Sequence, residues 1–153
     1  MTIEETLRKM GIELPKPAAP AANYLPFVRH GDLLFISGQV PLENGTVAVK
    51  GKLGDNVSLE DGKRAARICA VNVLGQVNAA LGGDLERIEQ FLRVTGFVAS
   101  APSFTDQPQV INGASDFFVE VLGDRGRHSR AAVGMAALPL DAAVEVDAIV
   151  AVK

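Results

Sequence analysis

The sequence is poor in cysteine and in aromatic residues. Cys69 is the only cysteine, tryptophan is absent, and aromatic residues make up 5% of the 153 positions. A single cysteine excludes an internal disulfide and a thiolate metal cluster, so the fold must be held by packing. Large aromatic side chains supply much of the buried area in most cores. The core is therefore thin, and we expect a second chain to complete it.

Long apolar runs and strong charge are also missing. No apolar stretch reaches the roughly 18 residues that a membrane-spanning helix needs, and the net charge is −3. Glu4 and Glu5 precede any basic residue, and no apolar signal core accompanies them. We therefore predict a cytoplasmic protein without a membrane partner. Phosphate binding draws chiefly on Lys and Arg, which makes nucleic acid a disfavoured partner.

The composition that is present, 48% hydrophobic and 22% charged, is typical of one globular domain. Residues 2–10 form a predicted short helix, in which Thr2 and Glu5 have the spacing of a capping box and Gly11 ends the helix. Residues 14–22 are rich in Pro and Ala and indicate an extended linker. The sequence thus predicts an N-terminal extension over residues 1–22 and a domain over residues 23–153.

Within this domain, strand-like and helix-like patterns alternate. Period-two or short apolar segments predict strands, and apolar residues at three- and four-residue intervals predict helices. The strands fall at residues 24–29, 33–37, 46–50, 89–100, 131–137 and 143–152, and the helices at 58–81 and 106–122. This order predicts an α+β fold with a six-strand mixed sheet and two helices on one face, because two helices cannot cover both faces. We expect another copy of the chain on the open face or edge.

Arg130 stands between a charged loop and an apolar strand, which holds its guanidinium near a rigid strand start. A planar fork of donors matches a carboxylate bidentately. The alternative is a solvated cation beside Arg125 and Arg127. The residues alone leave both interpretations open.

Glu145 and Asp147 share one face of the last predicted strand, and Val144 and Val146 occupy the other. The plain interpretation is a polar outer face. Ile149 and two alanines also lie on the Glu145 face, however, which favours cover by another subunit. A partly desolvated Glu145 would have a raised pKa, so it is a candidate general acid or base.

Two further features interrupt or begin strands. Gly38 follows Ser37 within the second strand, where a glycine marks either a close approach of the backbone to a ligand or an ordinary bulge. Tyr24, the only tyrosine, begins the first strand, and its ring packs in the core or its hydroxyl reaches a polar partner. The sequence leaves both interpretations open at each of these two positions.

The spacing of the other reactive side chains does not indicate catalysis or metal binding. Cys69 lies in the middle of a predicted helix, where such a residue is an inert small hydrophobe. His30 and His128 are isolated from cysteines and closely spaced acids, so we place both in loops and predict no metal site and no catalytic triad. No glycine-rich phosphate motif is present. Neither a metal nor an organic cofactor is expected.

Two separated segments resemble the signatures of a known family. Residues 34–41, LFISGQVP, are similar to a strand that ends in S-G-Q-[IV]-P. Residues 130–139, RAAVGMAALP, followed by residues 144–149, VEVDAI, are similar to R-[SA]-x-V-x-[VM]-x-x-L-P and then [VI]-E-[VI]-[ED]-[AC]-I. Over residues 24–152 the chain resembles the YjgF/RidA-like (reactive-intermediate deaminase, or endoribonuclease L-PSP) family, as a divergent branch with an N-terminal extension.

The resemblance implies a chorismate-mutase-like fold and a homotrimer, in which the sheets form a shared barrel and the pockets lie between subunits. Arg130 would bind the carboxylate of a small substrate, and Glu145 would position water or move protons. The other positions that match pocket residues of the family are Tyr24, Ser37, Gly38, Asn112 and Ala132. Ala132 stands where Cys or Ser is common, and Ser115 stands where a helix tyrosine is common.

The activity that the resemblance implies is hydrolysis (deamination) of reactive enamines or imines. Substrates such as 2-aminoacrylate or 2-imino acids would yield 2-oxo acids and ammonia, as in 2-iminobutanoate/2-iminopropanoate deaminases, and no cofactor would be needed. One alternative is a non-catalytic binder or sensor of small carboxylates. Another is an endoribonuclease on single-stranded RNA, which the acidic charge and the few aromatic residues disfavour.

Overall fold

The structure is a computed structural model that describes residues 1–17 and 22–153. Three α-helices and seven strands follow one another within these ranges. They are α1 (Ile3–Lys9), β1 (Phe27–His30), β2 (Leu33–Gln39), β3 (Leu42–Glu43), β4 (Thr46–Val47), α2 (Leu59–Ala80), β5 (Ile88–Ala99), α3 (Gln107–Leu122), β6 (Ser129–Met135) and β7 (Val144–Val152). Short 3₁₀ helices η1 (Leu85–Arg87), η2 (Gly123–Gly126) and η3 (Pro139–Asp141) join some of them.

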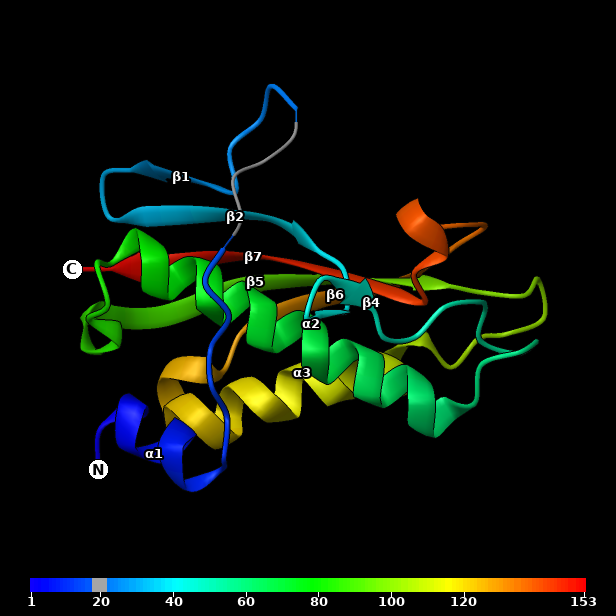
Figure 1. The fold of residues 1–153 in the computed structure, drawn as a ribbon, viewed down its shortest axis with the longest axis horizontal. Coiled ribbons are helices and arrows are strands. Elements are labelled where there is room, and N and C mark those ends of the chain that lie inside the picture. The colour runs from blue at the N-terminus through cyan, green and yellow to red at the C-terminus, as the bar shows by residue number, and fades with distance from the viewer. Residues whose placement is uncertain (18–21) are drawn as a thin grey trace.

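Five strands form the main sheet, in the order β1-β2-β7-β5-β6. Neighbouring strands run antiparallel except β5 and β6, which are parallel. Helices α2 and α3 lie together on one face of this sheet, and the other face is open (Figure 1). The predicted α+β class, the mixed sheet and the placement of both long helices on one face are confirmed.

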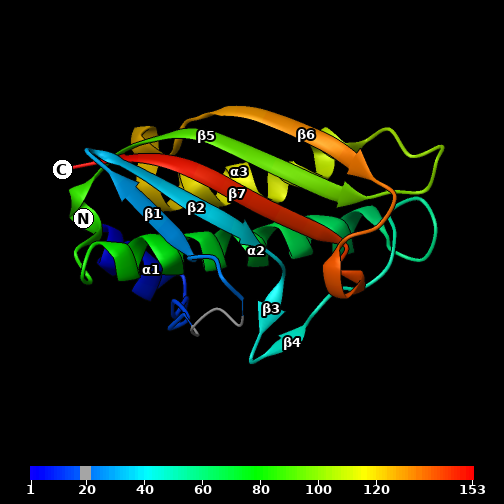
Figure 2. The ribbon, with the colours of Figure 1, turned by 90° about the horizontal axis from the view of Figure 1, so that it is seen from above.

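The sheet has five strands rather than six, because the third predicted strand does not join it. Only two of its residues, Thr46 and Val47, form a strand, and this strand, β4, pairs with β3 in a separate two-stranded sheet (Figure 2). Beyond Ile36 the register between β2 and β7 shifts, and Pro41, which has no N–H to donate, comes two residues after the end of β2. The tight turn at Asn44 and Gly45, both with positive φ, folds the next residues back on themselves.

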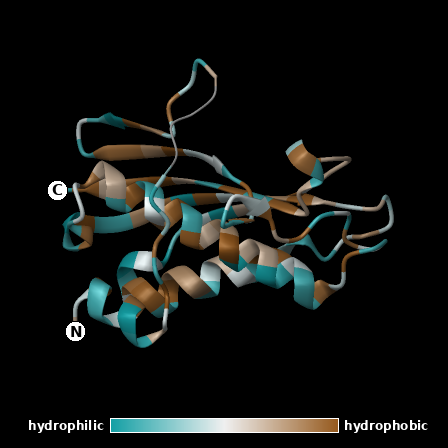
Figure 3. Cartoon of the chain, viewed as in Figure 1, coloured by the Kyte–Doolittle hydropathy of each residue, from teal (hydrophilic) through white to brown (hydrophobic). Residues whose placement is uncertain are grey.

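The core lies between the sheet and the two long helices. Alternate residues of β7, beginning with Val144 and ending with Val152, are fully buried on the helix side. Gly96 of β5 lets α3 approach closely, because a Cβ at this position would clash with Ile111. Apolar residues follow the central strands, and α2 and α3 alternate apolar and polar positions (Figure 3). Cys69 is buried, and burial raises the pKa of its thiol, as expected for an inert position.

Helix α1 has the predicted capping box. The N–H of Glu5 donates to the Thr2 hydroxyl at 3.1 Å, and the Thr2 N–H donates to the Glu5 carboxylate at 2.9 Å. Ile3 and Leu7 of this helix are buried in the main core. The predicted domain boundary after residue 22 stays a prediction, and residues 18–21 of the predicted linker lie outside the described residues.

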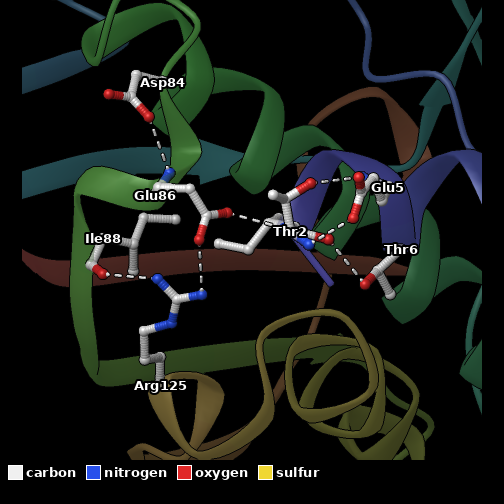
Figure 4. A network of polar contacts seen from close by, with 8 residues as sticks. Thr2, Glu5, Thr6, Asp84, Glu86, Ile88 and Arg125 are labelled. Atoms are coloured by element: carbon white, nitrogen blue, oxygen red, sulfur yellow. Dashed lines mark hydrogen bonds and ion pairs between the residues drawn. The ribbon is translucent and has the colours of Figure 1, made fainter.

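A carboxylate fixes the start of α1 to the rest of the domain. The Glu86 Oε2 atom accepts the Ile3 N–H at 2.8 Å, and Glu86 Oε1 lies 3.3 Å from the Arg125 guanidinium (Figure 4). The hydrogen bond from Ile3 is the main reason that the pKa of Glu86 lies below its ordinary value.

Among the described residues no helix combines the length and apolar character that a bilayer crossing requires.

Candidate functional site

Arg130 lies on β6, at one edge of the sheet, opposite Val94 of the neighbouring strand. Its guanidinium reaches over to α3 on the helix side. The Nη1 group donates to Asn112 Oδ1 at 2.8 Å and to Ser115 Oγ at 3.2 Å, and Nη2 donates to the Pro108 carbonyl oxygen at 3.4 Å. The structure therefore brings together two of the predicted site residues, Arg130 and Asn112.

Part of the Arg130 guanidinium has no partner within the described chain. Asn112 and Ser115 occupy Nη1, whereas Nε–H and one Nη2–H form no hydrogen bond with the described residues. Nor does Arg130 form an ion pair with any carboxylate among them. The Nε and Nη2 donors lie on one edge of the guanidinium, and such an edge matches the two oxygens of a carboxylate. The geometry thus suits the binding of a small anion.

Ala132 is two residues further along β6, so its side chain points to the same side as Arg130. It stands opposite Gly96 and packs partly against the core. This position offers a methyl group where a polar side chain would offer a hydrogen bond. The surroundings of Arg130 are accordingly apolar on this side.

Glu145 lies on the opposite, open face of the sheet, because Val144 and Val146 on either side of it are buried against the helices. An added Cβ on Gly38 would lie 2.8 Å from Glu145 Oε2 and 2.9 Å from its Cδ. The glycine therefore makes room for the carboxylate. The close approach of Gly38 is to a side chain of the same chain, and it coincides with the register shift between β2 and β7.

The segment before β1 is tied to the same region. The Ser37 hydroxyl donates to the Leu25 carbonyl oxygen at 2.6 Å, next to Tyr24 in the chain. The Tyr24 side chain does not pack in the core of the single chain, because the residue is 58% exposed. Ser37, Gly38 and Glu145 form one group, which the segment carrying Tyr24 approaches.

Burial shapes the ionisation of the carboxyl groups on this face. It raises the pKa of Glu145 above its ordinary value, and the charge of Asp147 raises it further. Burial also raises the pKa of Asp147 itself. The raised pKa moves Glu145 toward the range in which a carboxyl group exchanges protons near neutral pH.

The structure does not bring Arg130 and Glu145 together within one chain. Strand β5 separates β6 from β7, and Arg130 is opposite Val94 whereas Glu145 is opposite Phe97. From standard strand spacings the two Cα atoms lie roughly 14 Å apart. The two side chains also lie on opposite faces of the sheet, so a small substrate cannot contact both in one chain.

The open face has a hollow that is lined in part by Ser37. A cavity of 430 Å³ lies between Val28 and Phe35 on one side and Arg93 and Asp147 on the other. Val28 is 50% exposed and Phe35 is 42% exposed. A larger cavity, of 510 Å³, lies beside α1 and η1, remote from both Arg130 and Glu145. Of these two cavities, only the first is lined by a predicted site residue, Ser37.

A serine and a histidine extend the group around Arg130. The Ser115 hydroxyl lies 2.9 Å from His128 Nε2, and His128 Nδ1 lies 2.6 Å from the Gly126 carbonyl oxygen. Burial lowers the pKa of His128, and the charge of Arg130 lowers it further. The sequence contains two indications that Ser115 and His128 lie close to Arg130. Ser115 is one helix turn from Asn112, and His128 precedes Arg130 by two residues at a strand start.

Nothing in the described ranges is arranged as a metal centre. No group of three or more His, Cys, Asp or Glu side chains there is placed to hold a metal ion. The donors around Arg130 are an amide, a hydroxyl and a backbone carbonyl. These groups orient a guanidinium.

The sheet order, the two helices on one face and the two residue groups define an α+β domain of the chorismate-mutase-like kind. The family described as "YjgF/chorismate_mutase-like, putative endoribonuclease" matches residues 4–151. The chain belongs to this family, and the predicted resemblance is confirmed.

Three known proteins show the range of similarity. "Protein TCP17" from Trypanosoma cruzi is 47% identical over 149 residues, which cover 97% of this chain and 92% of that protein. The crystal structure of the protein Atu1372 with unknown function from Agrobacterium tumefaciens is 52% identical, with a TM-score of 0.93 over 99% of this chain and 92% of that one. The structure of E. coli TdcF with bound serine is 25% identical, with a TM-score of 0.62 over 90% and 94%.

Proposed function

We propose that the protein hydrolyses reactive enamines or imines that carry a carboxylate, giving 2-oxo acids and ammonia. The observation that carries this proposal is the Arg130 guanidinium, which Asn112 and Ser115 hold while Nε–H and one Nη2–H have no described partner. Charge-assisted hydrogen bonds of this kind contribute about 1.5–3 kcal/mol each. A small 2-imino acid places its carboxylate against the Nε–H and Nη2–H donors of Arg130, and its imine carbon then points away from the guanidinium.

The remaining chemistry falls to Glu145. Its carboxylate accepts a proton from water as the water oxygen adds to the imine carbon, and it returns a proton to the nitrogen, which leaves as ammonia. The net reaction consumes one water per imine. Imine hydrolysis proceeds readily in water, so fixing the reactants supplies much of the required acceleration. Enamines first take up a proton at carbon to give the imine.

Because Arg130 and Glu145 lie on opposite faces of one chain, the proposal requires that each site combine Arg130 of one copy with Glu145 of another. Members of the YjgF family are commonly homotrimers. The exposed apolar residues Val28 and Phe35 support cover of the open face by another copy. The proposed assembly is a homotrimer with sites at its interfaces.

A second candidate is a carboxylate binder or sensor without catalysis. The bound serine in E. coli TdcF favours it, because serine carries a carboxylate. The same Arg130 anchor serves both functions. They differ in whether Glu145 acts on a bound molecule.

A coupled assay separates the two candidates. A serine/threonine dehydratase generates the imine, semicarbazide traps it, and the protein competes with the trap. We expect less semicarbazone with the wild type and no such decrease with Arg130→Ala. Arg127→Ala is the matched control, since this arginine lies nearby and pairs only with exposed Asp124. An unchanged semicarbazone yield with the wild type would refute the deaminase, and incubation with single-stranded RNA tests the ribonuclease alternative.

A further inference from the structure

The hydrogen-bond directions around Arg130 can be assigned from chemistry alone. The Gly126 carbonyl oxygen only accepts, so His128 Nδ1, 2.6 Å away, carries a proton. In the neutral imidazole, Nε2 is then an acceptor, and the Ser115 hydroxyl donates to it at 2.9 Å. The Ser115 oxygen keeps its lone pairs for the Arg130 Nη1–H at 3.2 Å. The donors form an unbroken chain from Arg130 through Ser115 and His128 to Gly126.

We propose that Ser115 and His128 are positioning residues for the Arg130 anchor, and that they couple carboxylate binding at Arg130 to protonation of His128. This inference rests on the proposed carboxylate anchor and adds a regulation to it. His128 fixes the orientation of the Ser115 O–H bond. Ser115 in turn holds Nη1 of Arg130, so that the Nε and Nη2 edge of the guanidinium faces the ligand. A proton on His128 adds positive charge behind a guanidinium that has no carboxylate partner in the described chain.

Arg130 is the charged group that acts on His128 from β6. From α3, His128 meets Ser115 and the Phe118 ring, and neither titrates in this pH range. On the η2 side, Arg125 and Arg127 are engaged in their own ion pairs, with Glu86 and Asp124. From β5, Gln90 donates to the carbonyl oxygens of Asp124 and Arg127 and carries no charge.

The sign of the coupling follows from charge. A bound carboxylate neutralises Arg130, which removes a repulsion from the imidazolium and raises the pKa of His128. By reciprocity, a proton on His128 strengthens carboxylate binding by the same factor. Unit charges about 7 Å apart that are screened as in bulk water shift a titration midpoint by about 0.4–0.5 pH unit, which corresponds to about threefold in affinity.

NMR of the two histidines tests this inference, with pyruvate as the probe. His128 should show the Nδ1–H tautomer, and saturating pyruvate should raise its titration midpoint by about 0.5 pH unit. His30, the last residue of β1, is the internal control, and adding pyruvate should leave its signals unchanged. In calorimetry, pyruvate should bind about threefold more tightly at pH 5 than at pH 8.

Three variants distinguish positioning from simple packing. His128→Gln keeps an acceptor for Ser115 but cannot titrate, so it should keep the pH 8 affinity and lose the additional pH dependence. Ser115→Ala should weaken pyruvate binding at every pH, and Ser115→Thr should restore it. If pyruvate binds through Arg130 while the His128 midpoint stays fixed or its tautomer is Nε2–H, the coupling is wrong and the anchor stands. If the wild type binds no pyruvate, both the anchor and the coupling are wrong.

Discussion

Replacing Gly38 with alanine places one methyl group against the Glu145 carboxylate. The added Cβ would lie 2.8 Å from Oε2, 2.9 Å from Cδ and 3.2 Å from Cγ. Ordinary carbon contacts are about 3.5–4.0 Å, so the carboxylate must retreat by roughly 0.5–1 Å. All three contacted atoms belong to one flexible side chain, and Gly38 does not have a positive φ. The side chain, and not the backbone, therefore moves.

The expected cost in stability is small and the expected cost in rate is large. An off-rotamer side chain costs about 0.5–1.5 kcal/mol, and Gly→Ala gains about 0.4–1 kcal/mol by restricting the unfolded chain. The free energy of unfolding should change by less than about 1 kcal/mol. A 1 Å misplacement of a catalytic group lowers the rate by up to about 100-fold. We expect kcat/KM to fall about 10- to 100-fold.

The semicarbazide-coupled assay measures the rate, and urea denaturation measures stability. The matched control is the same substitution in a Glu145→Ala background, where no carboxylate is left to displace. There Gly38→Ala should change kcat/KM less than twofold, because effects that pass through one residue are not additive. Wild-type activity in Gly38→Ala, or an equal loss in both backgrounds, would refute the assigned role of the Gly38–Glu145 contact.

Three further substitutions have expected outcomes. Asp147→Asn removes a charge that raises the pKa of Glu145, so the acid limb of kcat/KM should move to lower pH; an unmoved limb contradicts Glu145 as the base. Glu86→Gln should lower Tm at pH 7 but not near pH 3, because a lowered carboxyl pKa stabilises the fold above the unfolded pKa and that gain is lost as pH falls; thermal scans at both pH values check this. Gly113→Ala should destabilise by about 1–3 kcal/mol in urea, since its Cβ would clash with the Lys63 carbonyl, whereas exposed Asp116→Ala on the same helix should not.

Elements governed by local chemistry were predictable from the sequence. Ser58, the first residue of the predicted helix 58–81, caps α2, with its hydroxyl accepting the Asp61 N–H at 3.1 Å. Asp106, the first residue of the predicted helix 106–122, is the N-cap of α3, but its side chain makes no capping hydrogen bond. The pattern of apolar residues predicted where α3 begins. The packing of α3 against the rest of the domain stabilises this helix in place of a side-chain cap. The third predicted strand does not join the main sheet, because its pairing depends on the path of the chain after Pro41, which periodicity does not encode.

The residues of the site were predictable, but their grouping was not. Arg130 and Glu145 are 15 positions apart in two motifs that follow one another, which suggests a single cluster. Because β5 lies between β6 and β7, the two residues are on strands that are not neighbours, and the register places them on opposite faces. Strand order is a non-local property, decided by the packing of whole elements. The contact between Ser115 and His128 depends on the same packing of α3 beside β6.

This separation has a chemical consequence for each group. If Arg130 and Glu145 were in contact within one chain, the ion pair would occupy the guanidinium and lower the pKa of Glu145. On opposite faces, Arg130 keeps donors for a ligand, and Glu145 keeps the raised pKa that burial and Asp147 give it. The folded chain thus holds an anion receptor and a proton acceptor that do not neutralise each other. Their meeting across an interface, with a carboxylate ligand between them, is the arrangement in which both properties serve one reaction.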